Sequence, residues 1–114
     1  MSLTHKFEAY LKAYEEKDLA KVSGMFSEDI HLRDWKISVT GKEVAVSETK
    51  KNFESADGIT IDILNMYESS DAVAGELCIV VDKTEVLYVV DVVTFNSEGL
   101  IQSIRAYLGR EDCG

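Results

Sequence analysis

Proline is absent from this sequence of 114 residues, and cysteine and histidine occur only twice each. Without proline, no boundary between elements can be located by the residue that interrupts helices and strands most strongly. We expect Cys78 to be a small core residue and Cys113 to lie in a mobile tail, both reduced, with one disulfide between them as the alternative. His5 and His31 fall on separate predicted elements, so no metal site is predicted.

Long apolar runs and positive charge are also scarce. No stretch approaches the ~20 apolar residues of a membrane span, and the N-terminus lacks the basic region and apolar stretch of a secretory signal. With 12 basic and 21 acidic residues, the formal net charge is −9, which repels nucleic-acid phosphates and anionic lipid surfaces. Phosphate-binding loops and nucleophile motifs are missing as well. We therefore expect a cytoplasmic protein with no nucleic-acid partner, no membrane partner and no cofactor.

Hydrophobic residues are abundant, at 46% of the chain, and the length suits a single domain over residues 1–114. In the first half of the chain their spacing is helical. Residues 4–17 carry one apolar face at positions i, i+3, i+4 and i+7, formed by Phe7, Tyr10, Leu11 and Tyr14. Thr4 is predicted to cap this helix, and Asp18 to cap a shorter second helix that reaches Phe26.

The remaining pattern is one of strands interrupted by a single helix. Residues 30–39 are predicted to form one or two short strands, and Gly41 to open a third helix over residues 42–53. From residue 59 onward the period changes to two, which predicts strands over residues 59–67, 73–81, 86–95 and 100–108. Helices followed by a run of antiparallel strands indicate an α+β fold.

The predicted strand 86–95 is apolar on both faces. One face carries Leu87, Val89, Val93 and Phe95, and the other carries Val86, Tyr88, Val90 and Val92. A strand buried on both faces needs a layer of structure against each of them. The three helices can cover one face, and we predict that a second copy of the chain covers the other in a homodimer.

Asp91 stands among valines in the middle of this strand, on the same face as Val89 and Val93. A lone carboxylate in such surroundings is costly unless it is paired, or protonated and hydrogen-bonded. Desolvation would raise the pKa of Asp91, and the neutral acid could then donate a hydrogen bond. The alternative is that Asp91 meets a lysine or faces water at an opening.

Two further residues are candidates for the same chemistry. Asp34 precedes Trp35, and a carboxylate beside a large aromatic side chain could act as a general base in a partly dry site. Taken alone, Asp34 also suits a turn. Tyr10 lies on the apolar helix face and taken alone suits a core tyrosine whose hydroxyl is satisfied at an edge.

With these three residues taken together, the sequence resembles the Δ5-3-ketosteroid isomerases of the nuclear-transport-factor-2-like superfamily. The SnoaL-like polyketide cyclases are similar to these isomerases in fold. The matching segments are residues 10–19 (YLKAYEEKDL), residues 25–35 (MFSEDIHLRDW) with Gly41 beyond them, and residues 89–108 (VVDVVTFNSEGLIQSIRAYL). The last segment is the most specific, and residues 42–86 match only in element order. The resemblance implies a cone-shaped, curved mixed sheet wrapped around three helices, with an internal pocket.

The resemblance also implies a reaction and its residues. Asp34 would carry a proton between carbons next to a carbonyl, while Tyr10 and protonated Asp91 would donate to the oxygen of the dienolate. The ligand would be a small apolar carbonyl compound. The implied pocket lining consists of Phe26, Leu32, Trp35, Val89, Val93, Ile104 and Leu108.

The sequence departs from the family pattern at several of these positions. Phe26 stands where a second tyrosine braces the first, and Leu108 replaces a tryptophan of the pocket. The third helix is polar over residues 48–51, where an apolar lining is expected, so the pocket is predicted to be smaller or more polar than a steroid needs. Two functions stay open: an isomerase or cyclase, which we favour, and a non-catalytic ligand-binding or dimerisation module on the same fold.

Overall fold

The computed structural model describes residues 2–110, so the prediction for Cys113 lies outside the described residues. Three helices precede or interrupt six strands. The helices are α1 (Leu3–Glu15), α2 (Leu19–Met25) and α3 (Lys42–Ser55). The strands are β1 (Phe26–Arg33), β2 (Ser38–Thr40), β3 (Ile59–Glu68), β4 (Ala72–Val81), β5 (Glu85–Phe95) and β6 (Ile101–Leu108). No helix among these is long and apolar enough to cross a membrane.

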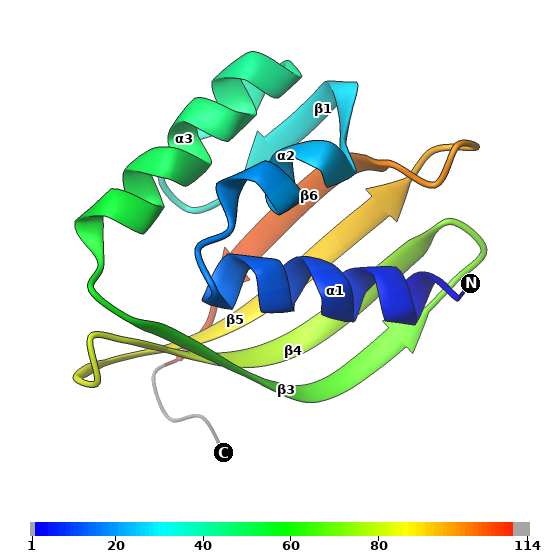
Figure 1. Cartoon of the computed structure of the whole chain (residues 1–114). Helices are drawn as coiled ribbons and strands as arrows, with labels where there is room; N and C mark the ends of the chain where they lie inside the picture. Colours follow the sequence, from blue (N-terminus) through cyan, green and yellow to red (C-terminus); the bar gives the residue numbers. More distant parts are fainter. Residues whose placement is uncertain (1, 111–114) are drawn as a thin grey trace.

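The six strands form one mixed sheet in the order β2-β1-β6-β5-β4-β3. Strands β1 and β6 are parallel, and every other neighbouring pair is antiparallel. Figure 1 shows that the sheet is curved and that all three helices lie on its concave face. The predicted α+β class, with a curved mixed sheet around three helices, is confirmed.

Most element boundaries lie within two residues of the predicted ones, and the two that bear on the predictions are the cap of α1 and the start of β1. Asp18 caps α2 as predicted, because its carboxylate accepts a backbone N–H of the first turn. The prediction of Thr4 as the first cap was wrong: Ser2 caps α1, and its hydroxyl oxygen accepts the backbone N–H of His5. Phe26 does not end α2 but begins β1, which therefore starts four residues earlier than the predicted strand at residue 30.

Burial on β5 alternates from residue to residue, as a strand with one covered face requires. Val89, Asp91, Val93 and Phe95 are buried beneath the helices, whereas the side chains between them are half-buried on the opposite face. Each fully buried branched side chain contributes roughly 1.5–3 kcal/mol relative to an exposed one. The helix-covered side of β5 is therefore part of the main core, and Asp91 is enclosed within it.

A close contact between α1 and the sheet fixes the height of this helix above Asp91. Gly75 of β4 pairs with Asp91 of β5, and the fully buried ring of Phe7 lies against Gly75. A Cβ atom on Gly75 would lie 2.5 Å from two ring atoms of Phe7, so only glycine admits the ring at this distance. The contact brings the next turns of α1, with Tyr10 and Tyr14, over the inner face of the sheet.

Candidate functional site

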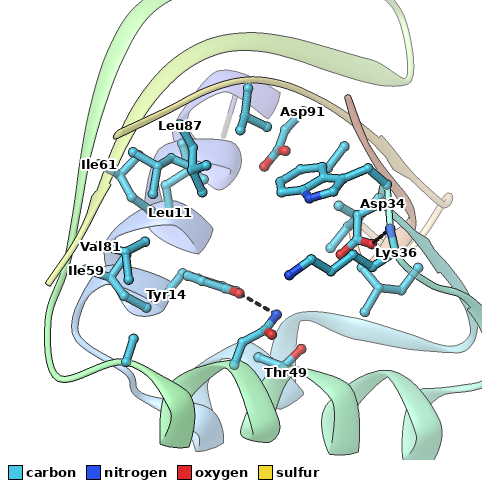
Figure 2. Close-up of a pocket in the computed structure, with 18 of the residues that line it drawn as sticks. Leu11, Tyr14, Asp34, Lys36, Thr49, Ile59, Ile61, Val81, Leu87 and Asp91 are labelled. Atoms are coloured by element: carbon cyan, nitrogen blue, oxygen red, sulfur yellow. Dashed lines mark hydrogen bonds between the residues drawn. The ribbon is translucent and has the colours of Figure 1, made fainter. Parts of the chain in front are cut away.

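A cavity of about 240 Å³ lies between the inner face of the sheet, α1 and α3. Its sheet wall is apolar and includes Ile59, Ile61, Ile79, Val81 and Leu87. The wall formed by α3 is polar, with Thr49, Asn52 and Ser55. Pockets for drug-sized ligands usually span ~300–1,000 Å³, so this cavity suits a smaller molecule with one polar side. Figure 2 shows the side chains that converge on it.

Asp91 brings a carboxyl group to this cavity from the middle of β5. Its side chain is only 8% exposed, between Val89 and Val93, and Figure 2 shows the carboxyl directed into the cavity. Burial, with a smaller contribution from the negative charge of Asp34, raises the pKa of Asp91 to about 7. At neutral pH a large fraction of Asp91 is therefore protonated and able to donate a hydrogen bond.

Tyr10 brings a phenol to the same cavity from α1. Burial is the main cause that raises the pKa of Tyr10 well above 10, with smaller contributions from Tyr14 and Asp91. Its ring packs against Phe26 with the ring centroids 6.4 Å apart. The Tyr10 hydroxyl therefore stays protonated across the physiological pH range.

Neither polar group has a partner within residues 2–110. No side-chain hydrogen bond joins the Tyr10 hydroxyl or the Asp91 carboxyl to another described residue. Every fully buried side-chain nitrogen or oxygen of the described residues has a hydrogen-bond partner, so these two groups are not fully buried. Both groups therefore keep some access to solvent, and both residues border the cavity. Two donors that face one apolar cavity are an arrangement suited to a carbonyl oxygen.

Asp34 follows β1 directly and borders the cavity in a half-buried position. The backbone N–H groups of Lys36 and Ile37 donate to its Oδ1 over 2.7 Å and 2.9 Å. The backbone N–H of Asp34 in turn donates to the carbonyl oxygen of Ile37 over 2.9 Å. These three bonds hold the carboxylate in a tight turn and leave Oδ2 outside the turn's own hydrogen bonds.

Sequence reasoning missed most of the polar residues of the cavity, among them Tyr14, Asn52 and Lys36. Asn52 Nδ2 donates to the Tyr14 hydroxyl over 3.1 Å, and both residues border the cavity. Burial raises the pKa of Tyr14, the Asn52 bond opposes this, and the charges of Asp91 and Asp34 add to it. Tyr14 lies one turn after Tyr10 on the same helix face, which was a usable signal. Lys36 also borders the cavity, and no spacing rule pointed to it.

The predicted lining residues divide into two groups. Leu32, Trp35, Val89 and Ile104 border the cavity, whereas Phe26, Val93 and Leu108 do not. Phe26 and Val93 are 1% and 0% exposed because they pack in the core behind the lining. Leu108 ends β6 and is 43% exposed. The three predicted catalytic residues, Tyr10, Asp34 and Asp91, all border the same cavity.

The chain is similar to a known protein family and to solved structures of the same fold. A family model described as a SnoaL-like domain matches residues 7–104. No sequence relative is found among curated proteins.

Three solved structures share the fold at low sequence identity. SalBIII, an epoxide hydrolase/cyclase-like enzyme in pyran ring formation in the polyether salinomycin, is 21% identical with a TM-score of 0.82, over 96% of this chain and 92% of that one. A Kribbella flavida protein assigned as a ketosteroid isomerase is 13% identical with a TM-score of 0.79, over 95% and 76%. A computationally designed 17-OHP binder is 18% identical with a TM-score of 0.78, over 90% and 89%.

Proposed function

Because the chain belongs to the SnoaL-like domain family, we propose that its cavity binds a small, largely apolar carbonyl compound and catalyses a proton shift next to the carbonyl. The observation that carries the proposal is the placement of three groups on one cavity: two donors without a protein partner, Tyr10 and Asp91, and the half-buried carboxylate of Asp34. A ketosteroid-isomerase-like isomerase and a SnoaL-like cyclase would both use this placement.

The proposed reaction begins when Asp34 takes a proton from the carbon next to the carbonyl. The C–H bond breaks, an O–H bond forms on Asp34, and the electron pair moves into a dienolate whose oxygen becomes negative. The Tyr10 hydroxyl and the neutral Asp91 carboxyl donate hydrogen bonds to that oxygen. Asp34 then returns the same proton to another carbon, so no atom or electron is gained or lost.

Each of these groups supplies a separate part of the rate enhancement. One preplaced donor to a developing oxyanion is typically worth about 3–4 kcal/mol of the barrier. A positioned general base typically contributes another factor of about 10²–10⁴. The neutral state of Asp91 matters most, because an ionised carboxylate could not donate and would repel the oxyanion.

The experiment that tests the reaction follows double-bond migration from 3-cyclohexen-1-one to the conjugated 2-cyclohexen-1-one by ultraviolet absorbance. This ketone suits the cavity of about 240 Å³. We expect Asp34→Asn to lower kcat by about 10²–10⁴-fold, because the amide cannot accept the proton. Asp62→Asn is the matched control, since Asp62 is exposed on β3 and away from the cavity. Equal, slow rates for the wild-type protein and Asp34→Asn would contradict the proposed reaction.

The competing proposal is a non-catalytic binding module. Its support is the designed 17-OHP binder, a protein of the same fold built to bind a ligand. The turn that holds Oδ1 of Asp34 also gives this carboxylate a purely structural role. Saturable ketone binding to the wild-type protein, with no double-bond migration, would favour the module over the enzyme.

We further propose that the chain is a single domain over residues 1–114 and works as a cytoplasmic homodimer. The support for the homodimer is the outer face of the sheet, defined here as the side away from the helices. Its exposed large side chains include Tyr67, Val86 and Tyr107, and its half-buried ones include Val90 and Val92 of β5. A second copy of the same face is the occupant that we propose for this surface.

A further inference from the structure

Lys36 places a positive charge at a cavity whose other charged side chains are acidic. It lies in the turn between β1 and β2, where its backbone N–H is bonded to Asp34. Figure 2 shows its side chain extending along the cavity toward Tyr14 and away from that turn. Within residues 2–110, its ammonium group takes part in no ion pair and no hydrogen bond, whereas Lys42 and Lys51 each pair with a glutamate.

The Tyr14 hydroxyl adds a second donor on the same side of the cavity. Because its oxygen accepts the bond from Asn52 Nδ2, its own proton remains available to the cavity. The amide of Asn52 carries a further N–H beyond the one that it gives to Tyr14. We call these three residues, Tyr14, Lys36 and Asn52, the donor end of the cavity.

We propose that the ligand of this cavity is an organic acid, with an apolar body against the sheet and a carboxylate bound by the donor end. The inference rests on the proposed function, because the carbonyl of the same molecule would lie at Tyr10 and Asp91. An ammonium group and a phenol that converge on one carboxylate form charge-assisted hydrogen bonds, which are stronger than bonds between neutral groups. The compound is therefore a small keto acid rather than a neutral ketone.

The other charges of the cavity determine the orientation of such a ligand. Asp34 and Glu85 also border the cavity, and each would repel a carboxylate placed near it, whereas protonated Asp91 carries no charge. Glu85 lies at the start of β5, next to the apolar sheet wall, and is exposed. Of the described residues that line the cavity, only Lys36 has a cationic side chain. The anionic end of the ligand is therefore directed to the donor end, and the apolar end to the sheet wall.

The test compares two probes that differ only in their terminal group, the anion 3-cyclohexylpropanoate and the neutral amide 3-cyclohexylpropanamide. Trp35 is the single tryptophan of the chain and borders the cavity, so its emission reports binding of these non-absorbing probes. At low ionic strength we expect the acid to bind the wild-type protein about tenfold more tightly than the amide, which is about 1.4 kcal/mol. Lys36→Met should bring the ratio of the two Kd values to about one, and Lys36→Arg should preserve most of it.

Lys50→Met is the matched control, because Lys50 is exposed on α3 and does not border the cavity. We expect this control to keep the wild-type preference for the acid. Equal binding of the two probes to the wild-type protein, or an unchanged preference in Lys36→Met, would overturn the inference. A preference for the acid without double-bond migration would leave the inference standing and remove the proposed reaction. Double-bond migration without any preference for the acid would support the proposed reaction and overturn the inference of an organic acid as ligand.

Discussion

Asp91 shows how a single residue can be costly to the fold and useful to the site. Its strand neighbours are valines, and its cross-strand partners on β4 and β6 are Gly75 and Ala106, so few polar groups surround the carboxyl. Charging an acid in such a place is unfavourable, which is why the pKa of Asp91 rises to about 7. The same desolvation that weakens the fold supplies a neutral donor to the cavity.

The raised pKa of Asp91 predicts a specific dependence of stability on pH. In the unfolded chain the pKa of an aspartate is about 3.9, whereas in the folded protein that of Asp91 is about 7. Between these values the folded state holds the extra proton. The contribution of Asp91 to the free energy of unfolding is therefore most favourable below pH 4. It falls by up to about 4 kcal/mol as the pH rises to 7. Urea denaturation at a series of pH values measures this fall.

Asp91→Asn is the control for this prediction, because an amide of the same shape does not titrate. We expect the variant to lose the fall between pH 4 and 7 and to be more stable than the wild-type protein above pH 7. If both proteins showed the same change in unfolding free energy with pH, Asp91 would not be the buried titrating group.

At the residue scale, part of the site was predictable and part was not. Tyr10 and Asp91 are polar side chains at positions that the apolar periodicity assigns to the core, and both border the cavity. Lys36 and Asn52 are polar residues in exposed positions, so nothing in the periodicity separates them from ordinary surface residues. Their approach to the cavity depends on the geometry of a turn and on the rotation of α3, which a one-dimensional pattern does not contain.

At the scale of the elements, the strand and helix types followed from periodicity, while the boundaries depended on local hydrogen bonds. The hydroxyls of Ser2 and Thr4 bond each other, and Ser2 rather than Thr4 caps α1. The ladder between β3 and β4 shifts register between Ile63 and Asn65, which a strict alternation cannot predict. The pairing of β1 with the distant β6 was likewise not visible in the pattern, because it joins segments far apart in sequence.

The contact between α1 and β4 predicts that Gly75→Ala destabilises the protein. The added Cβ would meet two atoms of the fully buried Phe7 ring at 2.5 Å, so the helix or the strand must shift. Overpacking of this kind typically costs about 1–3 kcal/mol. The free energy of unfolding from chemical denaturation measures the effect.

Gly24→Ala offers a control with the same chemical change. An added Cβ at Gly24 of α2 meets no atom within 4 Å. Within a helix this substitution favours folding by roughly 0.5–1 kcal/mol. Opposite signs for the two variants would support the close contact, and a neutral Gly75→Ala would disprove it.

For the molecule as a whole, the two faces of the sheet differ in what packs against them. The helices cover the inner face, and no other element of residues 2–110 lies on the outer face (Figure 1). On that outer face, Tyr67 and Tyr88 donate to the two carboxylate oxygens of Glu76 over 2.6 Å and 2.8 Å. The guanidinium of Arg33 lies 5.9 Å from the centre of the Tyr107 ring. Glu76 and Arg33 of this face are thus partnered within the chain, which lowers the cost of covering them.

The proposed homodimer predicts that Val90→Lys converts the protein to a monomer. Val90 lies half-buried in the middle of the outer face, and a charge there would be desolvated against the second copy. We expect sedimentation to give about twice the chain mass of 12.7 kDa for the wild-type protein and about that mass for the variant. Val44→Lys, on the exposed side of α3, should leave the mass unchanged. A wild-type protein that sediments as a single chain would exclude the homodimer.

The position of β6 in the middle of the sheet also has a consequence for biosynthesis. Of the described strands it is made last, yet it joins β1 to β5 and pairs Ile101 with Phe26. Until β6 has left the ribosome, β1–β2 and β3–β5 are two separate ribbons, each with an unpaired edge that can template aggregation. A nascent chain stalled before residue 101 is therefore a substrate for chaperones, whereas one extended past residue 108 can close its sheet in a single step.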